Sequence, residues 1–247
     1  MKRREEIKEY YEKFTENLIR DKINPNMRHR KIIGYLKKVF RRYDFNSALE
    51  IGCGIGIISE FISKNIPLVT GIDISEENIK FAKATVKSVN FHCSDFLEFS
   101  SKDRYDLITL FDVLEHIPKE IHPDVFKKIK EISDSNTIIL LTIPDPDYLS
   151  YIREHFPEKL QVVDESIYPD ELLQILKLNN LEAIKFEKYG VDYDDQYNFY
   201  LLHYKKKQYE LAPVVLDNNN FFLVNFRKLV NKIRRLINQI RFRKYLK

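Results

Sequence analysis

The chain has 247 residues, of which 44% are hydrophobic and 32% are charged, a composition typical of a soluble globular protein and not of a disordered one. No apolar run reaches the roughly 18 residues of a membrane span, and the basic N-terminus lacks the apolar segment of a secretory signal. Two cysteines, Cys53 and Cys93, are too few for a disulfide framework or a four-cysteine zinc site. The default prediction is a cytoplasmic protein.

Charge is distributed unevenly along the chain. The formal net charge is +4, yet residues 226–247 hold nine lysines and arginines and no acid. The remainder, four minus nine, therefore carries −5. An acidic body and a basic tail predict different partners for the two parts.

The first 44 residues are predicted to form an N-terminal helical cap. Apolar side chains recur at helical spacing between Ile7 and Ile19, and a second stripe runs from Ile32 to Phe40. The run Asn24-Pro25-Asn26 separates the two predicted helices.

Strand and helix alternate through the next hundred residues. The patterns predict helices at 55–63, 75–87 and 119–132, and strands at 47–51, 68–72, 89–93, 105–111 and 137–143. Repeated β-α units predict an α/β layer fold, with a largely parallel sheet covered by helices on both faces.

The pattern changes after Pro144. Residues 144–167 are rich in Pro, Asp and Tyr and are predicted to be a lid over the carboxyl edge of the sheet. A helix at 169–178 and a hairpin of 181–189 with 197–205 would complete a domain spanning 45–210. Residues 211–247 are predicted to be a linker followed by a basic amphipathic tail.

Three of the six glycines stand together, immediately after the first predicted strand. Gly52, Gly54 and Gly56 between a strand and a helix give the layout of a nucleotide-binding turn, where the backbone turns tightly and a ligand approaches it closely. The spacing G-x-G-x-G differs from the G-x-G-x-x-G of dinucleotide folds, and the missing G-K-[ST] excludes a P-loop. An ordinary tight turn is the alternative.

Four carboxylates accompany this turn. Glu50 precedes it, and Asp73, Asp95 and Asp112 end or follow the second, third and fourth strands. Ligands of open α/β sheets bind at that edge, and an acid about 20 residues after the glycines is placed to bond ribose hydroxyls. So many acids disfavour a pyrophosphate and predict a cationic nucleoside. As alternatives, Asp95 is a helix N-cap and Asp112 a structural acid.

These motifs together resemble the class I S-adenosylmethionine-dependent methyltransferases, over roughly residues 44–144. The segments that carry the resemblance are 48–56 (ALEIGCGIG), 71–75 (GIDIS), 93–96 (CSDF) and 111–118 (FDVLEHIP). The family fold is Rossmann-like, a seven-stranded, mostly parallel sheet with an antiparallel last strand. The resemblance therefore implies an enzyme that uses S-adenosylmethionine.

The resemblance also implies cofactor-binding roles by position. Glu50 and the backbone of Gly52, Cys53, Gly54 and Gly56 would hold the methionine part. Asp73, followed by Ile74, would take the ribose hydroxyls. Asp95, with the backbone of Ser94 or Phe96, would bind the adenine amino group, and Phe111 and Asp112 would line the methionine side.

His116 is the predicted catalytic base. It follows the fourth strand at the methyl-transfer edge, and an imidazole has a pKa near working pH. The alternative is that Glu115-His116-Ile117-Pro118 is only a structural helix entry. The rival bases are His155, Tyr148 and Tyr151. Arg28 and His29, before the second predicted helix, are predicted to lie on the surface, with a reach over the cofactor as the alternative. No metal site is predicted, because Asp145-Pro146-Asp147 stands where metal-dependent relatives carry an Asp-Asn pair.

The predicted reaction is O-methylation of a small molecule or a glycan, such as a cell-surface polysaccharide or a lipid-linked sugar. Two alternatives are an RNA methyltransferase that uses the basic tail and a non-catalytic protein that only binds the cofactor. The acidic body disfavours nucleic acid. The tail carries an apolar stripe from Phe226 to Ile240, which predicts a helix that docks on its own domain, pairs in a homodimer, or lies on the anionic inner surface of a membrane.

Overall fold

The computed structural model describes residues 2–23 and 26–205, the side chains of residues 2–9, 13 and 14 excepted. The N-terminal part forms helices α1 (Lys2–Ile23) and α2 (Met27–Phe40). Asn26 caps α2, because its side-chain oxygen accepts the backbone N–H of His29 at 2.9 Å. The predicted linker and basic tail at 211–247 lie outside the described residues.

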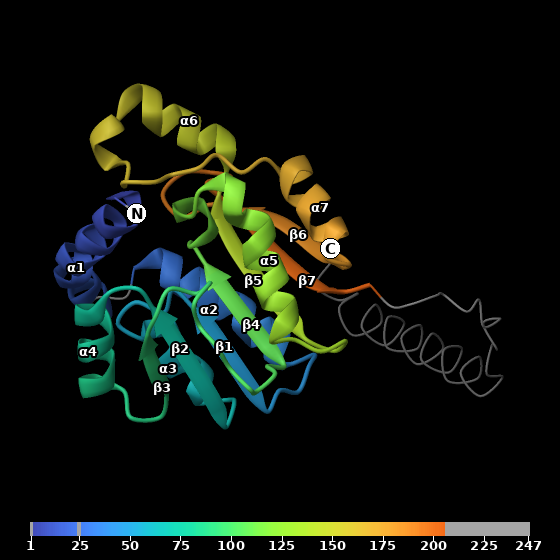
Figure 1. The fold of residues 1–247 in the computed structure, drawn as a ribbon. Coiled ribbons are helices and arrows are strands. Elements are labelled where there is room, and N and C mark those ends of the chain that lie inside the picture. The colour runs from blue at the N-terminus through green and yellow to red at the C-terminus, as the bar shows by residue number, and fades with distance from the viewer. Residues whose placement is uncertain (1, 24–25, 206–247) are drawn as a thin grey trace, which may run out of the picture. The chain divides into compact units, whose positions relative to one another are not determined.

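One seven-stranded sheet forms the centre of the described part (Figure 1). Its spatial order is β3-β2-β1-β4-β5-β7-β6, and β7, which lies between β5 and β6, runs in the direction opposite to the other six strands. The fold class predicted from the sequence is confirmed. The strands are β1 (Ser47–Ile51), β2 (Leu68–Asp73), β3 (Asn90–Cys93), β4 (Leu107–Phe111), β5 (Ile138–Pro144), β6 (Leu181–Tyr189) and β7 (Tyr197–Tyr204).

Helices pack on both faces of this sheet, which makes β4 and most of β5 wholly buried. On one face Leu36 and Ile62 pack with Leu140, and on the other Phe126 and Leu176 belong to the same cluster as Ile139. The remaining helices are α3 (Ile57–Ser63), α4 (Glu76–Thr85), α5 (His122–Glu131), α6 (Pro146–His155) and α7 (Pro169–Leu178), with short 3₁₀ turns η1 (Leu114–His116), η2 (Lys119–Ile121) and η3 (Pro157–Lys159).

The carboxyl ends of β1, β2 and β4 meet at one edge of the sheet, and two other parts of the chain reach this edge. Helix α1 lies beside α4, where the Thr15 hydroxyl donates to the Asn78 side-chain oxygen at 2.8 Å (Figure 1). The segment after α6 also returns to it, because the Glu165 N–H donates to the Glu115 carbonyl oxygen at 2.8 Å. The edge is therefore bordered by α1 and by the segment that follows α6.

Candidate active site

The turn after β1 has a conformation that only glycine adopts readily. Gly52 and Gly56 have φ of +69° and +79°. A Cβ atom on Gly52 would lie 2.4 Å from Val113 Cγ2, and one on Gly56 would lie 2.6 Å from Phe91 Cζ. The turn also delays α3, which begins at Ile57 and not at the predicted residue 55.

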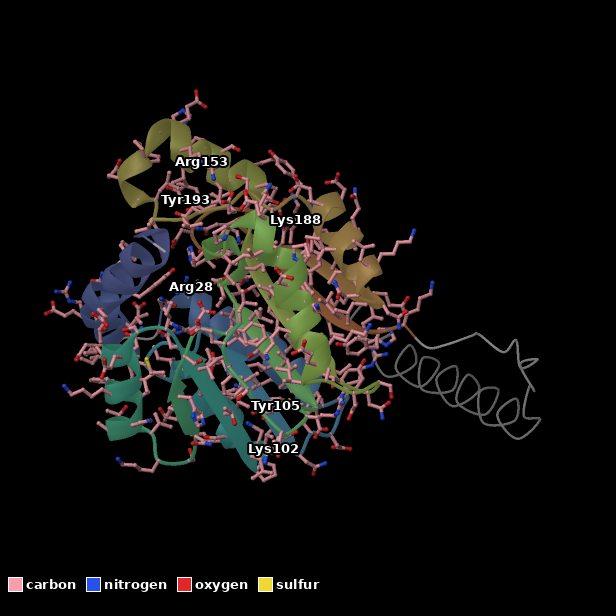
Figure 2. The ribbon with its side chains drawn as sticks, viewed as in Figure 1. Arg28, Lys102, Tyr105, Arg153, Lys188 and Tyr193 are labelled. Atoms are coloured by element: carbon pink, nitrogen blue, oxygen red, sulfur yellow. The ribbon has the colours of Figure 1, made fainter. Side chains whose placement is uncertain are left out.

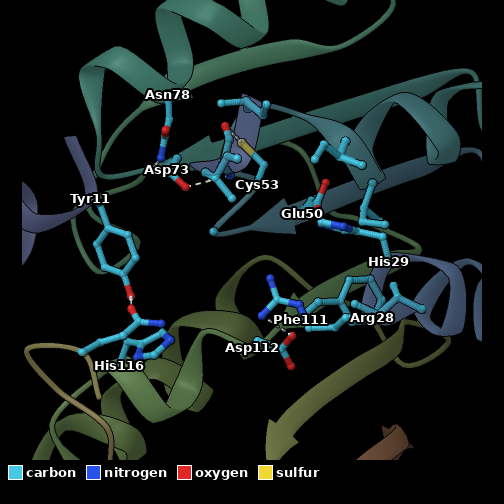
Figure 3. A pocket seen from close by; sticks show the side chains of 18 residues that line it. Tyr11, Arg28, His29, Glu50, Cys53, Asp73, Asn78, Phe111, Asp112 and His116 are labelled. Carbon is cyan, nitrogen blue, oxygen red and sulfur yellow. Dashed lines mark hydrogen bonds and ion pairs between the residues drawn. The ribbon is translucent and has the colours of Figure 1, made fainter. Parts of the chain in front are cut away.

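Two adjoining cavities open at this edge of the sheet, and Figure 3 shows the side chains that line the inner one. An inner cavity of about 130 Å³ lies against the glycine turn and α2, and an outer cavity of about 500 Å³ lies against the ends of β2 and β3. Five residues line both cavities: Tyr11, Gly52, Asp73, Asp112 and His116. Every site residue predicted from the sequence lines at least one cavity, except Gly56, which lies behind the turn against Phe91.

The outer cavity takes its polar groups from the ends of two strands. The Asp73 carboxylate accepts the N–H groups of Gly54 at 2.8 Å and Ser75 at 2.9 Å, so it ties the glycine turn to β2. Burial raises the pKa of Asp73, although these hydrogen bonds oppose the shift. Asp95 accepts the Leu97 N–H at 2.8 Å, which closes a local turn. The same residue lines the outer cavity, so this local hydrogen bond does not remove it from the candidate site. Ile74, Ser94 and Phe96 also line this cavity.

The inner cavity contains a buried carboxylate. Glu50 is 4% exposed and is hydrogen-bonded to the Ser59 hydroxyl. Burial raises the pKa of Glu50 to about 8, and the charge of nearby Asp73 adds to the shift. Cys53 and Phe111 line the same cavity. A cationic ligand would compensate the buried charge, so this cavity suits a positively charged group.

Arg28 and His29 line the inner cavity as well, so their predicted surface position is wrong. Asn26 caps α2, so Arg28 and His29 stand in its first turn, and Figure 3 shows both side chains at the inner cavity. Arg28 Nη1 lies 3.2 Å from Asp112 Oδ2. Burial and the charge of Arg28 lower the pKa of His29 to about 4, and its Nδ1 has no hydrogen-bond partner among the described residues.

Asp112 directly follows β4 and has a strained backbone conformation, with φ of +56°. Its N–H donates to the Thr142 carbonyl oxygen at 2.9 Å, and its Oδ1 accepts the Thr142 hydroxyl at 2.7 Å. Two contacts to β5 and one to Arg28 thus hold the carboxylate between the two cavities.

His116 stands in η1, where its side chain is 14% exposed and borders both cavities. Nδ1 lies 2.7 Å from the Val163 carbonyl oxygen and 3.1 Å from Asp164 Oδ1, whereas Nε2 lies 3.8 Å from Glu115 Oε1. Burial alone would lower the pKa of His116, but the Glu115 charge, the Asp164 hydrogen bond and the Val163 carbonyl together raise it. An imidazole in this position can accept a proton through Nε2.

Sequence reasoning did not find the side chains that cover the site. Tyr11 of α1 lines both cavities, and its ring centroid lies 5.9 Å from that of His116 (Figure 3). Its hydroxyl donates to Gln161 Oε1 at 2.8 Å, 150 residues along the chain. Neither residue lies in a recognisable motif, so no local signal could have indicated this contact.

The rival catalytic residues lie elsewhere. His155 is exposed on α6, where its ring stacks on Tyr151 at 4.3 Å, and Tyr148 packs near Tyr193. The structure places none of His155, Tyr151 and Tyr148 on either cavity. Asp145 is occupied by Lys188 Nζ at 2.8 Å and by the cap of α6. Within residues 2–23 and 26–205, no cluster of three or more His, Cys, Asp or Glu is arranged to hold a metal, and no helix is long and apolar enough to span a membrane.

Known proteins are similar to this chain in sequence and in fold. A family model described as "Methyltransferase domain" matches residues 3–194. A ubiquinone biosynthesis O-methyltransferase of Coxiella burnetii (strain Dugway 5J108-111) is 41% identical over 186 residues, which cover 69% of this chain and 73% of that protein. One from Hydrogenovibrio crunogenus is 27% identical over 150 residues, 55% of this chain and 61% of its own length.

Solved structures are similar to this chain in fold. The N-methyltransferase NodS from Bradyrhizobium japonicum, in complex with S-adenosylhomocysteine, gives a TM-score of 0.62 at 16% identity, covering 74% of this chain and 91% of that one. An S-adenosylmethionine-dependent methyltransferase from Clostridium acetobutylicum gives 0.62 at 14% identity, covering 77% and 98%.

Fold and site together define a class I S-adenosylmethionine-dependent methyltransferase. The chain belongs to the methyltransferase-domain family. It is an enzyme that takes its methyl group from S-adenosylmethionine.

Proposed function

We propose that this enzyme methylates a hydroxyl oxygen of a small organic acceptor, with His116 as the general base. The observation that carries the proposal is the His116 ring, which lines both cavities and whose Nε2 lies 3.8 Å from Glu115 Oε1, beyond hydrogen-bond distance. A hydroxyl must lose its proton when it is methylated, and a histidine is suited to take that proton. The names of the O-methyltransferase relatives support the same chemistry.

The two cavities fit the two halves of the cofactor. In the outer cavity Asp73 would accept the ribose hydroxyls and Asp95 the adenine amino group, with Ile74, Ser94 and Phe96 around them. In the inner cavity Glu50 would face the ammonium group beside the Gly52–Gly54 backbone. Burial disfavours the charged form of the Glu50 carboxylate and raises its pKa to about 8. A cationic ligand would offset this cost of burial.

Arg28 supplies the opposite charge in the inner cavity. A guanidinium has five N–H donors, and one nitrogen of Arg28 is engaged by Asp112 at 3.2 Å. We assign Arg28 to the cofactor carboxylate, because it is the arginine that lines this cavity and a planar guanidinium binds a carboxylate in a bidentate manner.

The chain's own residues then have three tasks in the reaction. S-adenosylmethionine supplies an electrophilic methyl group on a sulfonium, which becomes a neutral thioether when the methyl leaves. Cavity walls hold the acceptor oxygen in line with that methyl, and such positioning supplies much of a rate enhancement. His116 Nε2 takes the proton from the acceptor hydroxyl as the oxygen forms its bond to the methyl carbon. Glu115, which is 1% exposed and 3.8 Å away, faces the imidazolium that results.

The acceptor is tested first among hydroxylated aromatic rings and then among sugars. The relatives' names point to ubiquinone biosynthesis, and ubiquinone is a substituted ring, so phenols and catechols have priority. A glycan hydroxyl, free or lipid-linked, is the second class in the proposal.

The experiment measures S-adenosylhomocysteine released from methyl-labelled S-adenosylmethionine with each acceptor, and mass spectrometry locates the methyl. We expect an O-methyl product whose yield depends on His116. Matched acceptors whose hydroxyl is already methylated are the control, and they should give no methylated product and no release of S-adenosylhomocysteine. Methyl on nitrogen or on RNA, or cofactor binding without any transfer, would refute the proposal.

For the basic tail we propose peripheral contact with an anionic membrane surface. Its nine lysines and arginines, with no acid, each add on the order of 1 kcal/mol near such a surface. The full chain should sediment with anionic vesicles and not with neutral ones. A full-length variant with the nine cations changed to glutamine is the control. If the unchanged protein stays in the supernatant, the membrane proposal is wrong, and light scattering then tests a homodimer.

A further inference from the structure

The His116 ring is held by a segment far from it in the sequence. Nδ1 lies 2.7 Å from the Val163 carbonyl oxygen and 3.1 Å from Asp164 Oδ1. Both partners belong to the stretch after η3 and are 47 and 48 residues downstream of the histidine. The ring that borders the cavities is therefore oriented by the covering segment and not only by its own turn.

These contacts fix the tautomer of the neutral ring, that is, which of its two nitrogens carries the proton. A carbonyl oxygen only accepts hydrogen bonds, and so does an ionised carboxylate, so Nδ1 must carry the proton. In the neutral ring Nε2 then has a lone pair. Nε2 is 3.8 Å from Glu115 Oε1, which is beyond hydrogen-bond distance, so it stays available to a substrate hydroxyl.

Asp164 is itself fixed from several sides. Its Oδ2 accepts the Gln161 N–H at 2.5 Å, and Arg153 of α6, which is labelled in Figure 2, donates to its carbonyl oxygen and to the Ser166 hydroxyl. The Gln161 side chain in turn accepts the Tyr11 hydroxyl at 2.8 Å. A connected set of contacts thus runs from α1 through Gln161 and Asp164 to His116.

We propose that Asp164 is a positioning residue for the general base: by holding Nδ1–H of His116, it aims Nε2 at the acceptor, so the base is complete only when the segment from Gln161 to Asp164 is seated on the ring. This inference rests on the proposed function, in which His116 is the base. It goes further by making the covering segment part of the catalytic apparatus.

The charges around the ring agree with this role. Glu115 of the same turn and Asp164 of the covering segment face His116, and both raise its pKa against the effect of burial. Tyr11 of α1 packs its ring against the imidazole. Asp112 lies nearby and acts on Glu115, whose own pKa is raised to about 8, chiefly by burial. Removal of the Asp164 charge should therefore make His116 easier to deprotonate.

The first test needs no acceptor. Two-bond ¹H–¹⁵N spectra of the full chain, saturated with S-adenosylhomocysteine, report the tautomer and the titration of each histidine. The chain has six histidines, and the His116 signals are those lost in His116→Gln. We expect the Nδ1–H tautomer in the unchanged protein and a titration midpoint about 1 pH unit lower in Asp164→Asn.

Three further variants make this result decisive. Glu165→Gln removes the neighbouring acid and should leave the midpoint where it is, while Asp164→Glu keeps the charge and should largely restore it. Arg153→Gln loosens the segment and serves if Asp164→Asn fails to fold, since it should also lower the midpoint. An Nε2–H tautomer, an unchanged midpoint in Asp164→Asn, or an equal shift in Glu165→Gln would overturn the inference.

Kinetics separate this inference from the proposed function. With an accepted hydroxyl substrate, Asp164→Asn should lower kcat by at least about 10-fold, part of the 10²–10⁴-fold that a general base supplies, and move the acidic limb of the pH profile to lower pH. The KM values should stay within about 2-fold. An active His116→Ala enzyme refutes the base itself, whereas an inactive one beside a normal Asp164→Asn enzyme refutes only the role of Asp164.

Discussion

Two regions meet at the active site, and they are built differently. The floor, formed by Glu50–Gly56, Asp73 and Asp112 at the strand ends, is held by backbone groups such as the Cys53 N–H, which donates to the Ile72 carbonyl oxygen at 2.9 Å. The cover, formed by Tyr11, Arg28 and 161–165, is held mostly by side-chain contacts between segments far apart in sequence. Changes in the floor should therefore cost stability and cofactor affinity. Changes in the cover should affect turnover and its pH dependence, except at Arg28, which is assigned to the cofactor carboxylate.

The largest effect is expected where the two regions meet. His116→Ala should lower turnover by about 10²–10⁴-fold while S-adenosylhomocysteine affinity, measured by calorimetry, stays the same, because the ring acts on the acceptor proton. His155→Ala is the matched control, an exposed histidine on α6 whose loss should leave the rate unchanged. Near-normal turnover in His116→Ala would mean that positioning alone drives the reaction.

Gly52→Ala tests the rigidity of the floor. Its φ of +69° and the 2.4 Å approach of the new Cβ to Val113 predict a loss of about 2–4 kcal/mol in the free energy of unfolding, with weaker cofactor binding. Gly34→Ala is the control, because no atom lies within 4 Å of its Cβ position inside α2, and it should gain about 0.5–1 kcal/mol. Denaturant unfolding measures both, and equal stability of the two variants would contradict the assigned turn.

Asp73→Ala tests the floor's ligand contact. The loss of a charged acceptor for two ribose hydroxyls should weaken S-adenosylhomocysteine binding by about 1–3 kcal/mol. Asp103→Ala, which removes an exposed acid from the loop before β4, should bind normally. If calorimetry gives the same affinity for a folded Asp73→Ala protein, the assignment of the outer cavity to the nucleoside fails.

A further prediction concerns how the stability of the floor depends on pH through Glu50. Burial raises the pKa of Glu50 to about 8 in the folded protein, against about 4.5 for an ordinary glutamate. Folding therefore favours the protonated form, so its contribution to stability is complete below about pH 4.5 and is lost as the pH rises through 8. The cofactor-free protein should lose at most about 1.4 kcal/mol per pH unit over this window from this group.

Glu50→Gln should flatten that decline in thermal or denaturant unfolding, because the amide cannot ionise. Glu154→Gln, at an exposed position on α6, should leave the slope as it is. A slope that Glu50→Gln does not change would show that Glu50 stays ionised at neutral pH. Glu115, whose pKa is also raised to about 8, should account for part of the slope that remains.

The floor could be predicted from the sequence because each of its parts is a local feature of the chain. A strand, a glycine turn and a helix follow one another within residues 47–63, and the acids at 73, 95 and 112 each end or follow a strand. Parallel strands joined by right-handed crossovers must bring their carboxyl ends to one edge. Residues separated by 20 or 40 positions are thus brought together by rules that a sequence pattern already contains.

Contacts between elements explain where the boundaries shifted. Val89 and Tyr105 are apolar enough to extend a strand pattern, yet β3 begins at Asn90 and β4 at Leu107, where the ladder to β2 and β1 starts. The helix predicted from 119 begins as the 3₁₀ turn η2 before α5. Hydrogen-bond partners on other elements set such ends, and a single segment does not reveal them.

The sequence by itself determined the fold class, the cofactor and the floor of the site, because strand-and-helix periodicity and the glycine turn fix them through contacts that follow chain order. Only the tertiary structure decided that Arg28 turns inward to Asp112, that Tyr11 reaches Gln161, and that Asp164 meets His116. Those pairs join segments 48–150 residues apart through single side chains. Such contacts depend on how whole elements pack, and no periodic pattern in the sequence records them.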